Sequence, residues 1–369
     1  MKIGTLSLNI NTDDLNYGAM MHSWAFQQVL KKMDITEKAE IIDYTTGMLS
    51  DFDGNHPAVS YFRMKRVRSA VKILLSGTHY KKRYAKFKRF TREHMDVSEK
   101  HYSPKTLRNS SLPYDCLICE SDVIWSPKFF HDKLDPAFFL YFRAAKGKKR
   151  IIYAASMANA EFNEQTEKQL KKYLGSLEYI FCRESFACTK VKEVSGKTAE
   201  HVLDPVMLLN AEDYLPVCSE RLVKEPYLLL YIPVGYNGDY QKAAEKYACE
   251  NNLRLVELSY FTFQGRNHTV IADAGIEDFL SLIKNAETVF TNSFHAACFS
   301  LLFHVDFYVF SRKTGRKTED FCQWLGISER CMNVNDFEVK KPLDFEQTDK
   351  TIEEKRRTSL EWLEKAVRD

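Results

Sequence analysis

Short apolar runs alternate along the chain with longer segments in which apolar residues recur every three or four positions. The short runs are typical of buried parallel strands, and the longer segments are typical of amphipathic helices. In the first half we expect strands at 2–9, 38–43, 114–119, 149–155 and 178–183, and helices at 18–32 and near 163–174. This alternation favours an α/β protein built on parallel sheets.

A second series of the same kind follows a polar stretch at 210–225. We expect strands at 226–234, 253–259, 287–293 and 305–310, helices at 238–252, 276–286, 294–303 and near 316–325, and a last amphipathic helix at 351–367. The first series ends at the proline of HVLDP (201–205), since proline breaks regular structure. The pattern therefore predicts an N-terminal domain at 1–210, a C-terminal domain at 211–335, and a tail with a helix at 336–369.

The composition is that of a soluble globular protein. The 369 residues are 44% apolar and 28% charged, which fits two domains and excludes a disordered or fibrous chain. No stretch approaches the ~18 uncharged apolar residues of a membrane span, and the apolar run at the N-terminus is too short for a signal peptide. Nine cysteines lack the even spacing of a disulfide framework. We expect a cytoplasmic protein with free thiols.

The net charge of +3 conceals a strongly basic block. Residues 61–92 contain twelve Lys or Arg and no Asp or Glu, so the rest of the chain has an acidic excess. Apolar spacing within the block predicts two basic amphipathic helices, in an insertion at about 58–100 of the first domain. The block is either a solvated insertion or a surface for an anionic partner, such as the inner face of the membrane, a polyanionic glycan or an acidic subunit. No nucleic-acid module accompanies it, so no nucleic acid is expected.

Three loops that follow predicted strands carry polar residues that a core does not need. They contain Asn16, Tyr17 and Gly18; Ser121, Asp122 and Trp125; and Asn292, Ser293 and His295. Ligands of open parallel sheets bind at the carboxyl ends of the strands, so these loops are candidate site loops. The usual dinucleotide and P-loop glycine patterns are absent from the sequence.

Two of the candidate residues carry most of the chemistry. His295 begins an apolar helix directly after a strand, and it is either a core histidine or a functional one. Arg183 ends another apolar strand, where a permanent charge is costly to bury without an anionic partner.

Six short motifs in order resemble the polysaccharide pyruvyl transferase family. They are NYGA at 16–19, YD followed by SDVIW at 114–125, YAAS at 153–156, CRES at 182–185, LDPVMLL at 203–209 and TNSFHAACFSLLF at 291–303. The resemblance runs from residue 3 to about 330. The chain departs from the family pattern at three positions: Glu120 and Ala296 stand where glycine is common, and Val123 replaces the usual glutamine.

The resemblance implies two Rossmann-like domains of GT-B-like type and a specific reaction. Family members move a pyruvyl group from phosphoenolpyruvate onto two hydroxyls of a sugar, which gives a cyclic ketal. Phosphoenolpyruvate is then a co-substrate, the acceptor is a sugar or a lipid-linked glycan of exopolysaccharide biosynthesis, and no further cofactor or metal is expected.

The family chemistry assigns roles to the candidate residues. It makes His295 the general acid and base, because imidazole can both donate and accept a proton near neutral pH. It assigns binding of the donor's phosphate and carboxylate to Arg183, Asn292, Ser293, Arg312 and Arg316. Arg312 and Arg316 can also be ordinary exposed charges of a loop. The acceptor side contains Asn16, Tyr17, Gly18, Ser121, Asp122 and Trp125. Trp125 either stacks on a sugar ring or belongs to the core, and Asp204 is expected to cap a turn.

Two other functions stay open at this point. A GT-B-like glycosyltransferase that uses a nucleotide sugar has the same coarse pattern, with Glu319 and Asp320 as weak candidates for ribose contacts. A non-catalytic glycan- or lipid-binding relative is the other, and the substitutions at Glu120, Val123 and Ala296 favour it slightly.

Overall fold

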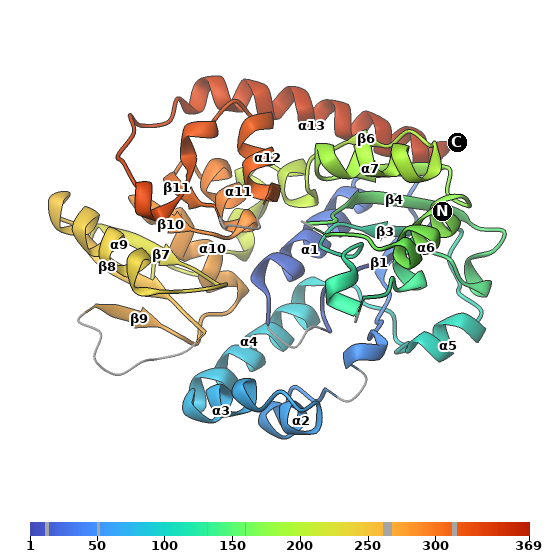
Figure 1. Ribbon diagram of the computed structural model, residues 1–369, viewed down its shortest axis with the longest axis horizontal. Coiled ribbons are helices and arrows are strands. Elements are labelled where there is room, and N and C mark those ends of the chain that lie inside the picture. The colour runs from blue at the N-terminus through green and yellow to red at the C-terminus, as the bar shows by residue number, and fades with distance from the viewer. Residues whose placement is uncertain (12–14, 50–51, 131, 159, 261–267, 312–315) are drawn as a thin grey trace. The chain divides into compact units, whose positions relative to one another are not determined.

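The computed structural model describes residues 1–11, 15–49, 52–130, 132–158, 160–260, 268–311 and 316–369. Contacts within the chain divide it into two compact units. Unit 1 comprises Met1–Ser50, Thr91–Leu209 and Ile352–Asp369, and unit 2 comprises Asp51–Phe90 and Asn210–Thr351. Each unit contains a six-stranded sheet with helices (Figure 1). The predicted α/β class with two parallel sheets is confirmed.

The sheet of unit 1 is parallel throughout, in the order β2-β1-β3-β4-β5-β6. Its strands are β1 (Lys2–Leu6), β2 (Lys38–Ile41), β3 (Cys116–Glu120), β4 (Lys149–Ala155), β5 (Tyr179–Cys182) and β6 (Glu200–His201). The chain builds outwards in one direction from β1 to β2 and in the other from β3 to β6. The direction therefore switches between β1 and β3, which is where open parallel sheets bind ligands.

The helices of this part of the chain show ordinary sequence signals at their ends. They are α1 (Tyr17–Lys31), α5 (Pro104–Asn109), α6 (Glu164–Leu174), α7 (Ser185–Ser195) and the C-terminal α13 (Phe345–Arg368), of which the residues up to Thr351 belong to unit 2. Helix α6 begins after Asn163, whose side chain accepts a hydrogen bond from the Thr166 amide, and it has acidic residues in its first turn and lysines in its last. Helix α7 ends at Gly196, which has a left-handed conformation with φ of 73°.

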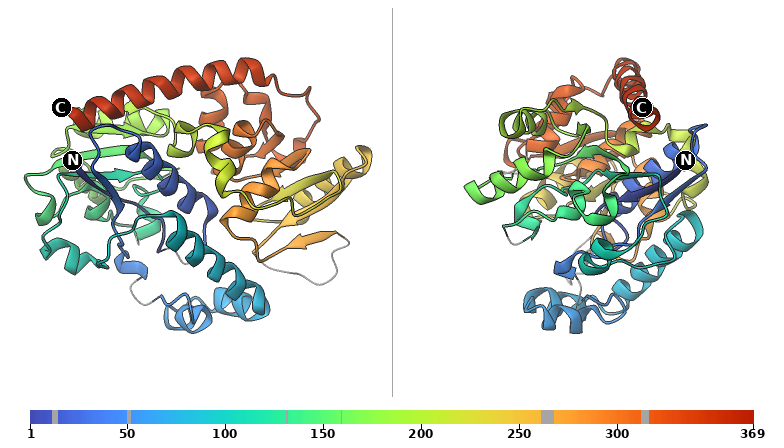
Figure 2. Two further views of the ribbon diagram at one scale, coloured as in Figure 1. Left: turned by 180° about the vertical axis from the view of Figure 1, so that it is seen from behind. Right: turned by 90° about the vertical axis from the view of Figure 1, so that its right-hand side faces the viewer.

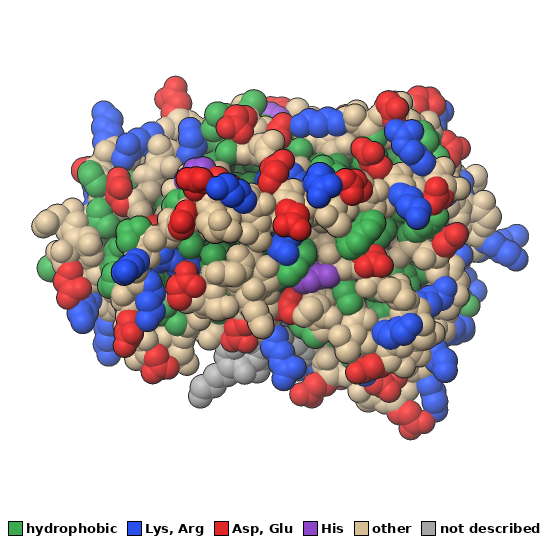
Figure 3. Space-filling view, turned by 90° about the horizontal axis from the view of Figure 1, so that it is seen from above, with side chains coloured by type: hydrophobic (Ala, Val, Ile, Leu, Met, Phe, Trp, Pro, Cys, Tyr) green, Lys and Arg blue, Asp and Glu red, His purple; other side chains and the backbone are tan. Residues whose placement is uncertain are grey.

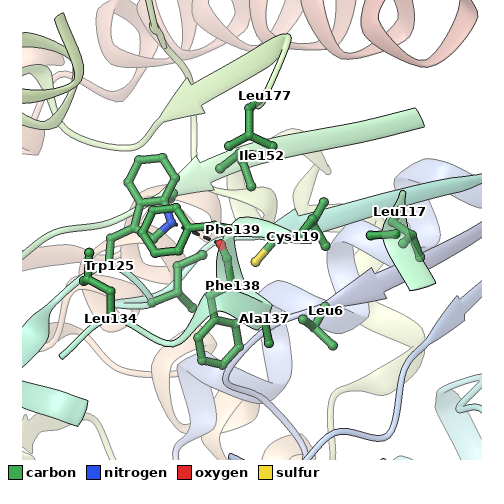
Figure 4. Packing of buried hydrophobic residues seen from close by; sticks show 14 of the residues in the cluster. Leu6, Leu117, Cys119, Trp125, Leu134, Ala137, Phe138, Phe139, Ile152 and Leu177 are labelled. Atoms are coloured by element: carbon green, nitrogen blue, oxygen red, sulfur yellow. Dashed lines mark hydrogen bonds between the residues drawn. The ribbon is translucent and has the colours of Figure 1, made fainter. Parts of the chain in front are cut away.

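The core of unit 1 is rich in aromatic side chains. Trp125 is fully buried, its ring stacks on Phe139 with centroids 5.0 Å apart, and its indole nitrogen donates to the Phe138 carbonyl (Figure 4). The indole thus has its polar atom satisfied and no face left for a ligand. Of the two roles that the sequence left open for Trp125, the structure selects the core.

The sheet of unit 2 is also parallel, in the order β12-β11-β10-β7-β8-β9. Its strands are β7 (Tyr227–Tyr231), β8 (Arg254–Leu258), β9 (Thr269–Ile271), β10 (Thr288–Thr291), β11 (Asp306–Phe310) and β12 (Cys331–Met332). The direction switches between β7 and β10. A second aromatic core that includes Tyr247, Phe290 and Tyr308 packs around these strands.

The helices of the second series include the segment that the sequence placed in the first domain. They are α2 (Pro57–Arg63), α3 (Val67–Leu75), α4 (Thr78–His94), α8 (Ala211–Tyr214), α9 (Gly238–Glu250), α10 (Ile276–Lys284), α11 (Phe294–Leu302) and α12 (Arg316–Trp324). The basic block thus forms three helices rather than the two expected. Helix α4 begins in unit 2 and ends in unit 1.

Residues 51–90 make their contacts with the second sheet unit, whereas the sequence suggested an insertion of the first domain. The physical reason is a set of polar contacts along α4. Arg83 is almost fully buried and donates to the Ala272 carbonyl, Lys86 pairs with Asp278 at 2.7 Å, and Arg89 pairs with Glu277 at 2.8 Å. The two acidic residues belong to the first turn of α10. Some of the basic side chains of the block are therefore paired with acidic side chains inside unit 2.

Both chain termini belong to unit 1, as Figure 2 shows. At the C-terminal end, Arg368 pairs with Asp34 at 2.5 Å and the Tyr179 hydroxyl donates to the Asp369 side chain. No helix in the described ranges is both long enough and apolar enough to cross a membrane.

Candidate functional site

Unit 1 buries ten polar side chains at or just after the ends of β1, β3, β4, β5 and β6 and on helix α1. The members are Ser7, Asn9, His22, Ser23, Glu120, Ser121, Ser156, Arg183, Glu184 and Asp204, each at most 4% exposed. Buried polar groups are costly unless they are paired, so a cluster of this kind needs an internal network. We call these ten residues, together with the partly exposed Asp122, the unit 1 cluster.

His22 and Glu120 form a buried ion pair at the β1/β3 switch point. The Nδ1 atom of His22 lies 2.7 Å from Oε2 of Glu120, and the Ser23 hydroxyl donates to the other carboxylate oxygen at 2.5 Å. Nε2 of His22 faces Oδ2 of Asp122 at 3.9 Å. Burial alone would lower the pKa of His22, but the two carboxylates outweigh it and raise this pKa to about 10. His22 is therefore an imidazolium at neutral pH.

Arg183 is held inside the protein by two carboxylates. Its Nη1 atom donates to Oδ2 of Asp204 at 2.7 Å, and its Nε atom lies 3.7 Å from Glu184. The Ser121 hydroxyl donates to the same Asp204 oxygen at 2.7 Å. Burial opposes the charge of Arg183, but these carboxylates raise the pKa of the guanidinium above its usual value. Asp204 also accepts from the Val206 amide, so the cap expected at this residue is confirmed.

The arrangement corrects the prediction that Arg183 binds a substrate anion. Only 2% of its side chain is exposed, and two protein carboxylates already balance its charge. The sequence correctly indicated that a buried arginine needs an anionic partner, but that partner is protein rather than ligand.

The backbone at the end of β3 is strained. Ser121 and Asp122 both have positive φ, 43° and 57°, which non-glycine residues rarely adopt. Ala154 on the neighbouring β4 also has positive φ, at a register shift between Ile152 and Ala155. The turn is held by the amides of Ser121 and Ser156, which donate to the carbonyls of Tyr153 and Asp122. Strain of this kind persists only where surrounding contacts enforce it, and it is concentrated at functional sites.

The strained turn brings the Asp122 carboxylate to the edge of the cluster. Its side chain is 14% exposed, whereas those of His22 and Glu120 are fully buried. Oδ1 of Asp122 accepts from the Val123 amide, and Oδ2 faces His22. Asp122 is thus the member that connects the buried ion pair to solvent.

The first candidate loop has a mainly structural role. Asn16 is half-buried and caps α1 by accepting from the Ala19 amide, and Gly18 lies buried in the first turn of that helix. Tyr17 is fully buried, so its ring cannot line an open acceptor site as predicted. Of the residues expected on the acceptor side, Asp122 and Asn16 reach the surface.

A second polar group lies at the β7/β10 switch point of unit 2. The Asn292 side chain donates to the Val234 carbonyl at 2.6 Å, which joins the loops after β10 and β7. The Thr291 hydroxyl donates to the Tyr231 carbonyl and accepts from the Ser293 amide. Ser293 caps α11 by accepting from the Ala296 amide. We call Thr291, Asn292, Ser293 and His295 the unit 2 cluster.

His295 lies in the first turn of α11 and is 7% exposed. Its ring meets Phe294 edge to face, with centroids 5.3 Å apart. The carbonyl oxygen of the Asn292 side chain is buried and has no hydrogen-bond partner among the residues that the structure describes. A nearly buried imidazole and an unsatisfied amide oxygen at a switch point form an arrangement that can hold a ligand and move a proton.

Of the two arginines predicted in the loop after β11 to bind phosphate or carboxylate, the structure describes one. Arg316 is exposed at the first residue of α12. Arg312 lies outside the described residues. No group of three or more His, Cys, Asp or Glu side chains within the described ranges has an arrangement suited to a metal ion.

Sequence reasoning missed His22 as a member of the first cluster. The available signal was Glu120, a carboxylate at the end of an apolar strand, because such a group needs a buried partner. His22 lies on the first predicted helix, at 18–32. Ser156 and Glu184 lie in two of the quoted motifs but were not assigned to a site, and Ser23 gave no comparable signal.

The family model described as polysaccharide pyruvyl transferase matches residues 16–314. A search of curated proteins found no match.

Solved structures with a similar fold include three sugar-nucleotide or lipopolysaccharide enzymes. UDP-GlcNAc 2-epimerase from Methanocaldococcus jannaschii has a TM-score of 0.52 at 11% identity, over 96% of this chain and 92% of that one. The same enzyme from Neisseria meningitidis has a TM-score of 0.46 at 9% identity, over 97% and 100%. The E. coli ADP-heptose heptosyltransferase II has a TM-score of 0.38 at 10% identity, over 96% and 99%. The predicted GT-B-like fold class is confirmed, and at these identities the likeness concerns the fold alone.

The His22–Glu120 pair predicts a specific pH dependence of stability. Because the pKa of His22 is about 10 in the folded chain and 6.5 in a free histidine, its stabilising effect is complete below pH 6.5 and disappears as the pH rises to 10. His22→Gln should therefore be less stable than the wild type at pH 6.5, and this difference should shrink towards pH 10. Each pKa unit corresponds to about 1.4 kcal/mol, so urea unfolding followed by circular dichroism can measure the change.

The control for this experiment is His101→Gln. His101 also pairs with an aspartate, but more than half of its side chain is exposed, so its removal should change little at either pH. A stability difference between wild type and His22→Gln that stays constant from pH 6.5 to 10 would contradict a charged, buried His22.

Proposed function

The chain belongs to the polysaccharide pyruvyl transferase family, and we propose that it transfers a pyruvyl group from phosphoenolpyruvate to a sugar of a polysaccharide or its precursor. The product would be a cyclic ketal. The observation that carries the proposal is the extent of the family match, because residues 16–314 include every member of both polar clusters except Ser7 and Asn9. Phosphoenolpyruvate is a co-substrate in this proposal, and no resident cofactor takes part.

The reaction has to move two protons and one phosphate. A proton adds to the methylene carbon of phosphoenolpyruvate, so that this carbon becomes a methyl group and its neighbour becomes electrophilic. A sugar hydroxyl attacks that neighbour and gives up its proton. The carbon–oxygen bond to the phosphate group then breaks, a second hydroxyl closes the ring at that carbon, and its proton leaves with the phosphate as hydrogen phosphate. The donor also carries a carboxylate and a phosphate, which require polar or cationic partners.

We assign the proton transfers to His295. Its imidazole is 7% exposed, and it lies at the end of β10, where parallel sheets place their ligands. The neighbouring Asn292 and Ser293, with the exposed Arg316 at the start of α12, are assigned to the anionic groups of the donor. The first turn of α11 supports this assignment, because the amino end of a helix favours negative charge.

Within unit 1, the unit 1 cluster offers a candidate contact for sugar hydroxyls. Asp122 is the natural contact, since its carboxylate is partly exposed while the strained turn and His22 hold it in place. Arg183 acts as a positioning residue, because its bonds to Asp204 and Ser121 fix the turn that carries Asp122. Glu120, which replaces a common glycine of the family, supplies the charge that balances His22.

Removal of His295 should abolish transfer without unfolding the chain. Loss of a general acid or base costs about 10²–10⁴-fold in rate, so His295→Ala should reduce phosphate release from phosphoenolpyruvate by that factor. The assay offers a panel of galactosides, glucosides and mannosides with free hydroxyl pairs as acceptors. His304→Ala is the matched control, because this histidine lies just beyond the same helix and is half exposed.

The melting temperature of the variants distinguishes a catalytic role of His295 from a role in packing. Equal melting temperatures of His295→Ala and wild type would support the assignment, and His295→Gln, which keeps the volume, covers the case in which alanine unfolds the chain. A His295→Gln variant with full transfer activity would contradict the role given to His295.

We further propose that α2 and α3 bring the enzyme to an anionic membrane surface, where lipid-linked acceptors are found. Eleven large apolar side chains in the described part of the chain are exposed, and six of them lie on these two short helices: Val59, Phe62, Val67, Val71, Leu74 and Leu75. Leu75 is 75% exposed and Leu74 is 62% exposed. Within α3, Ala70 is the one buried residue.

Basic side chains flank these apolar residues, and no acidic residue lies between positions 61 and 92. Arg63, Lys65, Arg68 and Lys72 are exposed on or between α2 and α3. The face shown in Figure 3 is different, since acidic and basic side chains are interspersed over it. Exposed apolar residues with surrounding cations are typical of helices that lie in the membrane interface.

Polar substitution of the two most exposed leucines should weaken this contact. Leu74→Ser combined with Leu75→Ser should reduce co-sedimentation with phosphatidylglycerol-containing vesicles by about tenfold or more, because both side chains lose apolar area to bury. Wild-type binding should fall with added salt and should be weak on pure phosphatidylcholine. The control is Leu215→Ser with Leu222→Ser, which changes two exposed leucines elsewhere in unit 2. Equal vesicle binding by both double variants would contradict the proposal.

A further inference from the structure

A groove of about 670 Å³ opens on unit 1, at the edge of the sheet where β4 and β5 begin. Its walls come from α5, the short helical turns Pro136–Phe139 and Arg143–Ala145, the start of β4 and the end of α6. None of the residues of the unit 1 cluster lines the groove. The volume is in the range of small-ligand sites.

The groove presents an aromatic ring that the core holds in place. Tyr141 is 37% exposed and packs on Tyr173, with ring centroids 4.9 Å apart. Tyr173 packs on Phe139 at 5.2 Å, and Phe139 stacks on the buried Trp125 (Figure 4). This chain of rings runs from the core to the surface, so Tyr141 can offer an apolar face to a ligand with little loss of conformational entropy.

The charge of the groove is strongly positive. Among its described lining residues five are basic, and Asp135 is the one acidic residue. Lys172 lies over the ring of Tyr141, with its nitrogen 5.5 Å from the centroid. Three of the cations, Arg108, Arg143 and Lys146, are exposed and form no ion pair with any residue in the described ranges. Their charges are available to a ligand.

Asp135 adds a fixed acceptor. Its two carboxylate oxygens accept from the Tyr44 hydroxyl and the Ala137 amide, each at 2.9 Å. These bonds hold the carboxylate and the Tyr44 hydroxyl at the wall of the groove. Both groups can hydrogen-bond to ligand hydroxyls.

The distribution of these groups favours an elongated ligand over a compact one. The free cations come from two separate parts of the chain, which are α5 and the turn Arg143–Ala145 with the residue that follows it. The nearest long helix, α6, presents its carboxyl end, which disfavours a diphosphate. A diphosphate is held best where several backbone amides converge at the start of a helix. A chain of sugar rings with spaced carboxylates meets the aromatic face, the hydroxyl partners and the separated cations at once.

We propose that this groove binds an acidic oligosaccharide, with one sugar ring stacked on Tyr141 and its carboxylates paired with Arg108, Arg143 and Lys146. The inference extends the proposed function, because the product of pyruvyl transfer is itself an acidic saccharide. The groove would retain a glycan chain at a distance from the sugar that reacts. It does not depend on transfer activity, since it concerns binding alone.

The test measures the dissociation constant of a galacturonic acid tetrasaccharide by isothermal titration calorimetry. The same tetrasaccharide as its neutral methyl ester is the matched ligand, and UDP is the competitor. The wild type should bind the acid at least about tenfold more tightly than the ester, with an affinity that falls as salt is added. Tyr141→Ala and Arg143→Ala should each weaken binding of the acid by about tenfold.

Lys171→Ala is the control variant, because Lys171 is an exposed cation of α6 that does not line the groove. It should bind as the wild type does, and His295→Ala should too, so a failure of the catalytic assignment leaves this test intact. Tyr141 and Arg143 are exposed, so both variants should keep the wild-type melting temperature; Tyr141→Phe, which keeps the ring, should retain binding. Three outcomes would overturn the proposal: no measurable binding of the acid, equal binding of acid and ester, or displacement of the acid by UDP.

Discussion

The buried ion pair between Arg183 and Asp204 is the interaction on which the unit 1 cluster depends. Arg183 directly follows β5, and Asp204 caps the turn that leaves the first series of strands. Ser121, at the end of β3, hydrogen-bonds to both. Loss of one partner of such a pair costs about 3–5 kcal/mol, because the other charge stays buried and unpaired. The pair therefore fixes the strained turn at Ser121 and Asp122, and through it the carboxylate that faces solvent.

Other charged side chains of the molecule are also paired with protein groups. His22 forms an ion pair with Glu120 at the β1/β3 switch point. On α4, two basic residues form ion pairs with acidic residues of α10, and a third donates a hydrogen bond to the Ala272 carbonyl of unit 2. Other cations are exposed beside exposed apolar or aromatic side chains. This occurs on α2 and α3 and again in the groove beside Tyr141. These are the surfaces at which we propose contact with membrane lipid and acidic glycan.

The sequence predicted the fold well because apolar periodicity reports burial directly. The strand at 149–155 matches β4, and the helices at 18–32 and 163–174 match α1 and α6 within one residue at each end. The two-residue strands β6 and β12 were missed, since such short segments have no readable period. The packing partner of residues 51–90 could not be predicted either, because it depends on ion pairs between residues almost two hundred positions apart.

The site was predicted less completely than the fold. Strand-end position selected loops that lie at the switch points, but it could not tell which of their side chains face solvent. Tyr17, Trp125 and Arg183 carry suitable chemistry and lie in suitable loops, and yet all three are buried. His22 was missed because a histidine on an apolar helix face shows no sign of the carboxylate that it meets in the fold.

The most direct test of the account is the change in melting temperature on adding phosphoenolpyruvate, compared with UDP, GDP and inorganic phosphate. A ligand at about 100 times its dissociation constant adds about 2.7 kcal/mol of stability, which gives a readable shift. We predict a rise with phosphoenolpyruvate that exceeds the rise with phosphate and does not occur with either nucleotide. A rise with UDP or GDP and none with phosphoenolpyruvate would contradict pyruvyl transfer and favour a nucleotide-sugar transferase.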